Sequence, residues 1–250
     1  MESSGMTAVM LESPIDLDIA IATPEALIEG DWTVPPDPKG TIILTNGTGT
    51  NRRSDRNREV SRILNDAGFA TLLLDILCED EEREDSLTGT FQLDVKLQAE
   101  RLLAAAEWVK DSEVGSLPIG ILASGVASAA AVVASVREPQ LISTIVSRGG
   151  RPDLAAIDLH RLTTPTLLIT GSQDAQIFEL NRWALRRMKG EGRIAVVPGA
   201  THLFEESGAL QEMCSLAIRW FYTRLYKVPL AISRARLEIG SMSSAVPAGR

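Results

Sequence analysis

Asp174 and His202 are the two side chains in this sequence whose types and spacing point most directly to catalysis. Each follows a short apolar run that predicts a buried strand, residues 166–170 before Asp174 and residues 194–197 before His202. In a parallel sheet both side chains lie at the same edge, where a carboxylate can orient an imidazole and stabilise its protonated form. The pair therefore predicts a general base held by an acid. In the alternative interpretation, a solvated aspartate and a loop histidine never meet.

Other chemistry finds less support in the residue types. Cys78 and Cys214 form no CxxC pair, and His160 has no second histidine or cysteine nearby, so no metal site is predicted. The turn at residues 47–49 (GTG) with the later Asp75 resembles a dinucleotide fingerprint, but the third glycine is missing. No cofactor is predicted.

The composition predicts a globular protein. The chain has 250 residues, of which 44% are hydrophobic and 23% charged, which excludes disorder of the whole chain. The net charge of −8 argues against a nucleic-acid binder. No apolar run approaches the roughly 20 residues of a membrane-spanning helix, and the N-terminus lacks the basic region of a signal peptide. We therefore expect a soluble cytoplasmic protein with neither a nucleic-acid nor a membrane partner.

The elements that must position the pair alternate between strands and helices. Alternating apolar and polar residues over 15–21 predict a half-buried strand, with residues 26–34 as its antiparallel hairpin partner. The later apolar runs, each followed by an amphipathic segment, indicate a parallel sheet covered by helices on both faces, with about eight strands and six helices in all. These strands are expected at 41–45, 70–77, 117–124, 141–147, 166–170 and 194–197. Five of the helices are expected at 54–67, 95–109, 127–136, 177–188 and 206–226.

The predicted domain covers residues 13–227. Residues 1–12 are expected to form a loose tail and residues 228–250 a flexible one, the alternative being a C-terminal tail that packs or binds a partner. The acidic run at 79–85 is expected to be a solvated face. The oligomeric state is not predicted.

Several long segments carry a family resemblance. Residues 40–221 resemble the dienelactone-hydrolase-like branch of the α/β-hydrolase superfamily. The stretches that carry it are 46–57 (NGTGTNRRSDRN), 70–77 (ATLLLDIL), 145–154 (IVSRGGRPDL), 167–174 (LLITGSQD) and 197–206 (VPGATHLFEE). The resemblance implies the α/β-hydrolase fold, in which nucleophile, acid and histidine follow in that order, and hydrolysis of a small ester or lactone.

The resemblance also implies roles for particular residues. The acid of the family falls on Asp174 and its general base on His202. Asn46 departs from the family, which usually has a histidine before the glycine of the oxyanion loop. The implied oxyanion donors are Gly47, Thr48, Gly49 and the amide of Val126.

The nucleophile elbow of the family reads small-x-Ser/Cys-x-small, directly after the central strand. Small residues are needed on both sides because strand and helix approach closely there. Centring the pattern on Gly125 places Ala123 and Ala127 at those positions, whereas centring it on Ser124 places larger side chains there. Glycine adopts the strained elbow conformation at little cost but has no side chain. We therefore predict that catalysis is impaired or altered.

Three substitutes for the nucleophile stay open. Ser124 could act in a slipped elbow, and Cys78 follows a neighbouring strand. A water activated by His202 and Asp174 could replace the side chain altogether.

Five arginines on segments at the predicted strand ends allow a second function, the binding of an anionic small molecule without turnover. They are Arg52, Arg53, Arg56, Arg148 and Arg151, of which Arg52, Arg148 and Arg151 are the candidate anion-binding residues. In the alternative interpretation these arginines pair with nearby acids. A third possible function is partner binding through the tail at 228–250.

Overall fold

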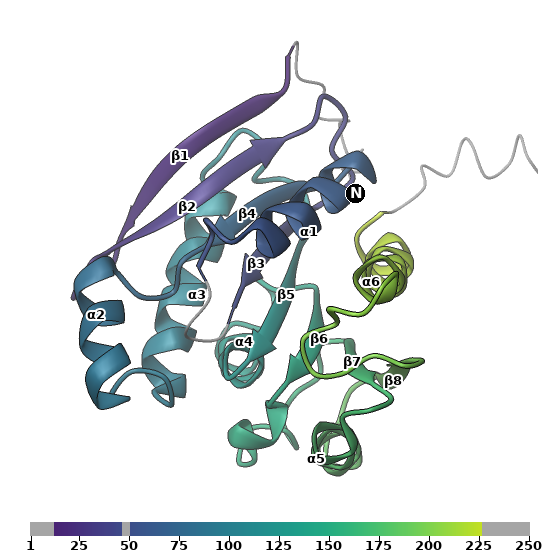
Figure 1. Cartoon of the computed structure of the whole chain (residues 1–250). Helices are drawn as coiled ribbons and strands as arrows, with labels where there is room; N and C mark the ends of the chain where they lie inside the picture. Colours follow the sequence, from purple (N-terminus) through teal and green to yellow (C-terminus); the bar gives the residue numbers. More distant parts are fainter. Residues whose placement is uncertain (1–12, 47–50, 227–250) are drawn as a thin grey trace, which may run out of the picture.

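Within the described residues, 13–46 and 51–226, eight strands form one mixed sheet in the computed structural model (Figure 1). The strands are β1 (Ile15–Ala22), β2 (Leu27–Val34), β3 (Thr41–Thr45), β4 (Ala70–Leu74), β5 (Ile119–Gly125), β6 (Thr144–Gly150), β7 (Thr166–Gly171) and β8 (Gly192–Val197). Their order is β1-β2-β4-β3-β5-β6-β7-β8. β1 and β2 form an antiparallel hairpin, β2 is antiparallel to β4, and the remaining neighbours are parallel. The predicted tails and the predicted oxyanion residues 47–49 lie outside the described residues.

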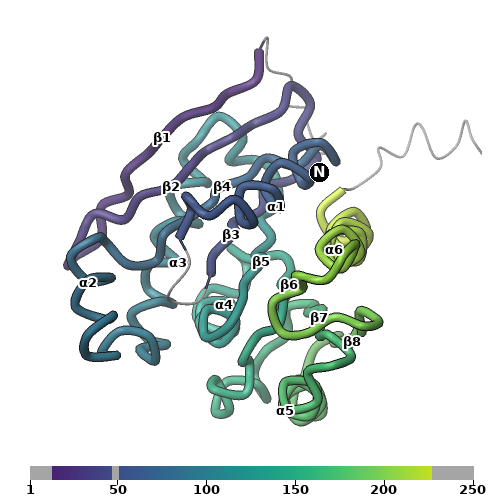
Figure 2. The backbone as a smooth tube through the Cα atoms, in the orientation of Figure 1, coloured from purple at the N-terminus to yellow at the C-terminus, as the bar shows by residue number. Residues whose placement is uncertain are grey.

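Helices cover both faces of the sheet (Figures 1 and 2). The helices are α1 (Asp55–Asp66), α2 (Glu79–Thr88), α3 (Val95–Lys110), α4 (Ala127–Arg137), the 3-10 helix η1 (Pro152–Ala155), α5 (Ala175–Leu185) and α6 (Ala209–Leu225). α1 and α6 pack on one face, and α3, α4 and α5 on the other. This architecture confirms the predicted fold, a mostly parallel sheet with an N-terminal antiparallel hairpin. In the part of the chain that the structure describes, no helix is both long and apolar enough to cross a bilayer.

The local sequence explains where the elements begin. All residues of β3, β4 and β7 are buried, as expected for wholly apolar runs in a sheet covered on both sides. Ser54, Asp94 and Asp174 are the N-caps of α1, α3 and α5, and each side chain accepts a hydrogen bond from the backbone N–H three residues on. One of these caps, Asp174, is also the candidate catalytic acid.

One helix and several element boundaries differ from the sequence-based expectation, most clearly those of β4 and β6. The acidic run at 79–85 belongs to helix α2, which has no apolar face for a periodicity to reveal. Four acids in its first turn suit the positive end of the helix dipole, and Gly89 ends the helix in the left-handed conformation. β4 stops at Leu74 instead of residue 77, and β6 runs three residues later than expected, from Thr144 to Gly150.

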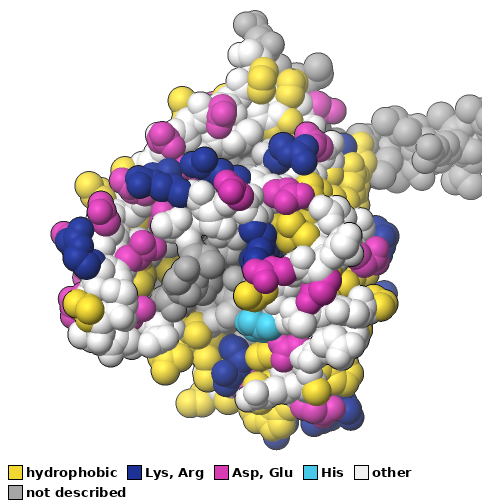
Figure 3. Space-filling model, viewed as in Figure 1, with side chains coloured by type: hydrophobic (Ala, Val, Ile, Leu, Met, Phe, Trp, Pro, Cys, Tyr) yellow, Lys and Arg dark blue, Asp and Glu magenta, His cyan; other side chains and the backbone are white. Residues whose placement is uncertain are grey.

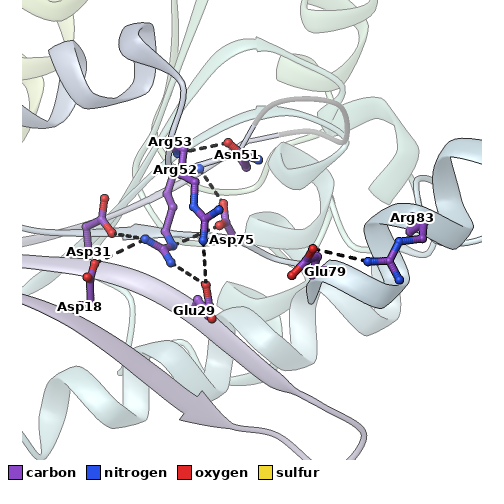
Figure 4. A network of polar contacts seen from close by, with 9 residues as sticks. All are labelled: Asp18, Glu29, Asp31, Asn51, Arg52, Arg53, Asp75, Glu79 and Arg83. Carbon is purple, nitrogen blue, oxygen red and sulfur yellow. Dashed lines mark hydrogen bonds and ion pairs between the residues drawn. The ribbon is translucent and has the colours of Figure 1, made fainter.

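Arg52 joins the N-terminal hairpin to the parallel part of the sheet (Figure 4). Its guanidinium lies 2.5 Å from Glu29 and 2.7 Å from Asp31 on β2, and 3.4 Å from Asp18 on β1. Its Nε lies 3.3 Å from Asp75, which also accepts a 2.6 Å hydrogen bond from the Arg52 backbone N–H. Burial raises the pKa of Asp75 to about 6. One buried cation thus holds four carboxylates from three segments, and in the chain it lies between β3 and α1.

Replacing this cation should destabilise the fold. We expect Arg52→Gln to lower the free energy of unfolding in urea by on the order of 2–4 kcal/mol, because four carboxylates lose the charge that they share. Arg53→Gln is the matched control, since the Arg53 side chain is 70% exposed and reaches Glu29 only at 4.0 Å. Arg53→Gln should lower the free energy of unfolding by less than about 0.5 kcal/mol. Equal losses for the two variants would show that the network does not stabilise the hairpin.

Candidate active site

Asp174 and His202 meet at the carboxyl edge of the sheet. Asp174 follows β7, His202 follows β8, and His202 Nδ1 lies 2.8 Å from Asp174 Oδ2. The other carboxylate oxygen of Asp174 accepts from the backbone N–H of Ile177 at 3.3 Å. One carboxylate therefore caps α5 and orients the imidazole. The Asp174 side chain is 14% exposed and that of His202 48% exposed, so a carboxylate shielded from solvent holds a histidine that is open to a ligand.

The loop that carries His202 crosses the end of β7 at very short range. A Cβ on Gly171 would lie 2.2 Å from the carbonyl oxygen of Ala200 and 2.5 Å from that of Thr201, so only glycine fits there. The Gln173 backbone N–H donates to the Ala200 carbonyl at 2.9 Å. This close approach brings the acid and the base, which follow different strands, within hydrogen-bond distance.

A second glycine, Gly149, packs closely against His202. Gly149, near the end of β6, has a φ of 52°, in the left-handed region. A Cβ on Gly149 would lie 3.0 Å from the His202 carbonyl oxygen and 3.4 Å from its ring atoms Cε1 and Nδ1. The imidazole can therefore occupy this position because residue 149 is a glycine, which has no side chain.

Gly125 lies at the turn from β5 into α4. Its φ is 54°, and α4 begins two residues later at Ala127. Ala123 and Ala127 on either side are fully packed, with exposures of 1% and 0%. A sharp strand-to-helix turn with a left-handed central residue and small neighbours is the geometry of a nucleophile elbow. Val126 follows as the N-cap of α4, where backbone N–H groups lack acceptors within the helix.

A cavity of about 330 Å³ joins the elbow to the histidine. Its described lining consists of Ser54, Arg56, Asn57, Ser124, Gly125, Arg148, Gly149, His202, Leu203 and Glu205. On the face shown in Figure 3, a histidine side chain lies exposed among acidic and basic groups. The structure thus brings three separately predicted residues, Gly125, Ser124 and His202, to one pocket. Cys78 is not among the described lining residues and instead caps the acidic helix α2.

Asn46, at the end of β3, is the centre of a polar cluster on the pocket wall. Its Oδ1 accepts hydrogen bonds from Arg148 Nη2 at 3.0 Å and from Ser124 Oγ at 3.5 Å. Ser124 and Arg148 are register partners on the neighbouring strands β5 and β6, so the three side chains lie across three strand ends. Sequence reasoning marked Asn46 only as a departure from the family, because the partners of a side chain on a distant strand are not visible in the sequence.

The family model of the dienelactone hydrolase family matches residues 28–215 of this chain. The chain belongs to the dienelactone hydrolase family. The match confirms the resemblance seen in the sequence. The structure is similar to that of dienelactone hydrolase from Anabaena variabilis ATCC 29413, with 36% identity, coverage of 86% of this chain and 100% of that chain, and a TM-score of 0.82.

This dienelactone hydrolase family member is also similar to two curated proteins and to a further solved structure. Two proteins of Mycobacterium tuberculosis, provisionally named phosphoribosyl transferases, are 39% identical over 211 residues, which is 84% of this chain. The chain spans only 47% of their length. The dienelactone hydrolase-like promiscuous phosphotriesterase P91 from metagenomic libraries shares the fold at 16% identity, with a TM-score of 0.69 over 85% of this chain and 99% of that chain.

In this dienelactone hydrolase family member, the predicted anion-binding arginines do not act together. Arg52 is surrounded by four carboxylates, and Arg151 forms a forked pair with its neighbour Asp153, with Nη2 2.8 Å and Nε 2.9 Å from its oxygens. Both arginines therefore agree with the alternative interpretation, in which they pair with nearby acids. Arg148 differs, because no carboxylate within the described ranges pairs with it. Asp75, the residue that suggested a dinucleotide site, is engaged by Arg52.

The close packing of Gly149 against His202 can be tested by comparing its alanine variant with that of Gly199, a second glycine in the left-handed conformation. We expect Gly149→Ala to lower the free energy of unfolding by about 1 kcal/mol more than Gly199→Ala. Both positions have positive φ, 52° and 73°, and so share the cost of a left-handed alanine, roughly 1–2 kcal/mol. Only Gly149 adds contacts with His202, since nothing lies within 4 Å of a Cβ on Gly199. Urea denaturation measures the difference, and the imidazole NMR signals of His202 should shift in the Gly149 variant alone. Equal costs with unshifted signals would contradict this packing.

Proposed function

We propose that this member of the dienelactone hydrolase family keeps the pocket and the His202–Asp174 dyad of a small-ester or lactone hydrolase but has lost the covalent step. The observation that carries the proposal is Gly125, which lies at the left-handed elbow position with φ of 54° and has no side chain. A serine or cysteine is the residue that a hydrolase of this family needs there. Catalysis through an acyl-enzyme is therefore impaired.

The loss is physically easy for the fold. A non-glycine residue in the left-handed elbow conformation stores on the order of 1–3 kcal/mol of strain, whereas glycine adopts it at little cost. The dyad, the packed alanines beside the elbow and the pocket depend on other contacts. The chemistry can disappear while the architecture of the site stays.

What remains in the pocket can support weak hydrolysis through water. His202 is positioned as a general base by Asp174, and a water next to Gly125 could take the place of the absent side chain. Without a nucleophile no covalent intermediate divides the reaction into two easier steps. We therefore expect turnover of esters to be slow at best.

A second candidate function, binding of an anionic small molecule without turnover, is favoured by Arg148. This cation lines the pocket beside Gly125 and pairs with no carboxylate among residues 13–46 and 51–226. In a protein with net charge of −8, an arginine without an acid partner in a pocket is a candidate anion site.

Hydrolysis of 4-nitrophenyl acetate tests the proposed loss. The wild type should release nitrophenol slowly and without an initial burst, and His202→Ala more slowly still, because His202 has only a water to activate and no acyl-enzyme accumulates. Gly125→Ser should raise kcat/KM at least about a hundredfold, since general-base activation contributes roughly 10²–10⁴-fold.

Two controls make this test decisive. Gly125→Ser/His202→Ala should lose the gain, and Gly125→Ala should show none although it shares the backbone cost at the elbow. A His202-dependent initial burst of nitrophenol from the wild type would overturn the proposed loss, because a burst reports an accumulating acyl-enzyme. A folded Gly125→Ser variant without any gain would show that the dyad and the elbow are not aligned for catalysis.

A further inference from the structure

Arg148 is a pocket residue whose charge the described protein leaves uncompensated. It lies near the end of β6, one strand away from the elbow, and its Cα is the register partner of Ser124. Its Nη2 donates to Asn46 Oδ1 at 3.0 Å, and its remaining N–H groups find no acceptor in the described ranges. A neutral amide thus fixes the guanidinium in place and leaves most of its donors for a ligand.

The groups around Arg148 do not neutralise it. Arg56, also in the pocket lining, is a second cation and is itself paired with Glu205. Cys214 of α6 lies close enough to interact electrostatically, but burial raises the pKa of its thiol to about 11, so it carries no negative charge at neutral pH. Asp174 is committed to His202. Arg148 therefore differs from Arg52, which has four carboxylates.

Burial makes this arrangement unfavourable without a ligand. It lowers the pKa of Arg148 to about 10, which leaves the guanidinium charged at neutral pH. A partly buried charge with a single neutral partner costs folding free energy, and such groups gather at functional sites. An anion that accepts from the free N–H groups would restore the missing compensation through charge-assisted, forked hydrogen bonds.

We propose that Arg148 forms a carboxylate subsite beside Gly125, and that the pocket binds a small free carboxylic acid instead of its ester. This inference rests on the proposed function, because it takes the pocket as a ligand site in which no acyl-enzyme forms. At an elbow without a nucleophile, an ester carbonyl forms no acyl-enzyme and offers a guanidinium only neutral acceptors. A guanidinium at the same place, next to a glycine that leaves space, fits the carboxylate group that ester hydrolysis would release.

Charge and size favour a single carboxylate over a phosphate dianion. One uncompensated cation matches one negative charge, and no second free cation is available for a dianion, because Arg56 in the described lining is already paired with Glu205. The cavity of about 330 Å³ lies at the lower end of the range for small-molecule sites, roughly 300–1,000 Å³. The ligand class is therefore a small organic monocarboxylate.

Isothermal titration calorimetry of the full chain tests the subsite with benzoate, methyl benzoate and inorganic phosphate. Benzoate should bind the wild type, and methyl benzoate, which has the same ring without the charge, should bind at least about tenfold more weakly. Arg148→Gln should weaken benzoate binding by about 10–100-fold, as expected for loss of hydrogen bonds to a charged group. Arg151→Gln is the matched control and should leave binding unchanged, because Arg151 is paired with Asp153.

The outcomes separate this inference from the proposed function. The subsite is overturned if benzoate does not bind the wild type, if Arg148→Gln binds it as tightly, or if methyl benzoate binds equally well. Arg148-dependent binding of phosphate but not benzoate also overturns it. Arg148→Lys, which keeps the charge, should retain part of the affinity and shows that Arg148→Gln did not simply unfold the pocket. A His202-dependent burst in ester hydrolysis by the wild type would overturn the lost covalent step and leave an Arg148-dependent benzoate site standing.

Discussion

The close approach of backbone segments at the carboxyl edge of the sheet is the constraint on which the site depends. β5, β6 and β7 each end at or near a glycine that has no room, or no suitable backbone conformation, for a side chain. Gly171 lets the His202 loop cross β7, and Gly149 leaves space under the imidazole. Gly125 turns the chain from β5 into α4. The hydrogen bond between Asp174 and His202 depends on the first two of these glycines, and the elbow geometry on the third.

Two arginines show how surroundings decide the role of one residue type. Arg148 lies near the end of β6 and Arg52 shortly before α1, and the sequence offers both as anion-binding residues. Arg52 meets acids from the hairpin and from β4, so its charge is used to hold the fold together. Arg148 donates to the neutral amide of Asn46 and lines the cavity beside Gly125. The same side-chain chemistry is thus paired with acids in one case and, within the described residues, with a neutral amide in the other.

The order of the sheet and the dyad could be predicted because they depend on local patterns. Apolar runs reveal buried strands, and an acid and a histidine after two late strands must meet at one edge if the strands are parallel. Helix α2 could not be predicted from periodicity, since its acids give it no apolar face. The sequence predicts acids as partners of Arg52 but not all of the acids that it binds. Asp75 is near in sequence, but Glu29 and Asp31 reach it because β2 pairs with β4, a long-range pairing that local patterns do not show. Asn46 and Arg148 met for the same reason, across three strands.

The central claim is that the elbow carries no nucleophile, and a covalent probe tests it most directly. A fluorophosphonate that reacts with activated serines would be incubated with the wild type and with Gly125→Ser, and the intact masses compared. The account predicts an unmodified wild type and one adduct per chain in the variant, located on the new serine. An adduct on the wild type that maps to Ser124 would contradict the account, because it would show that a slipped elbow supplies the nucleophile.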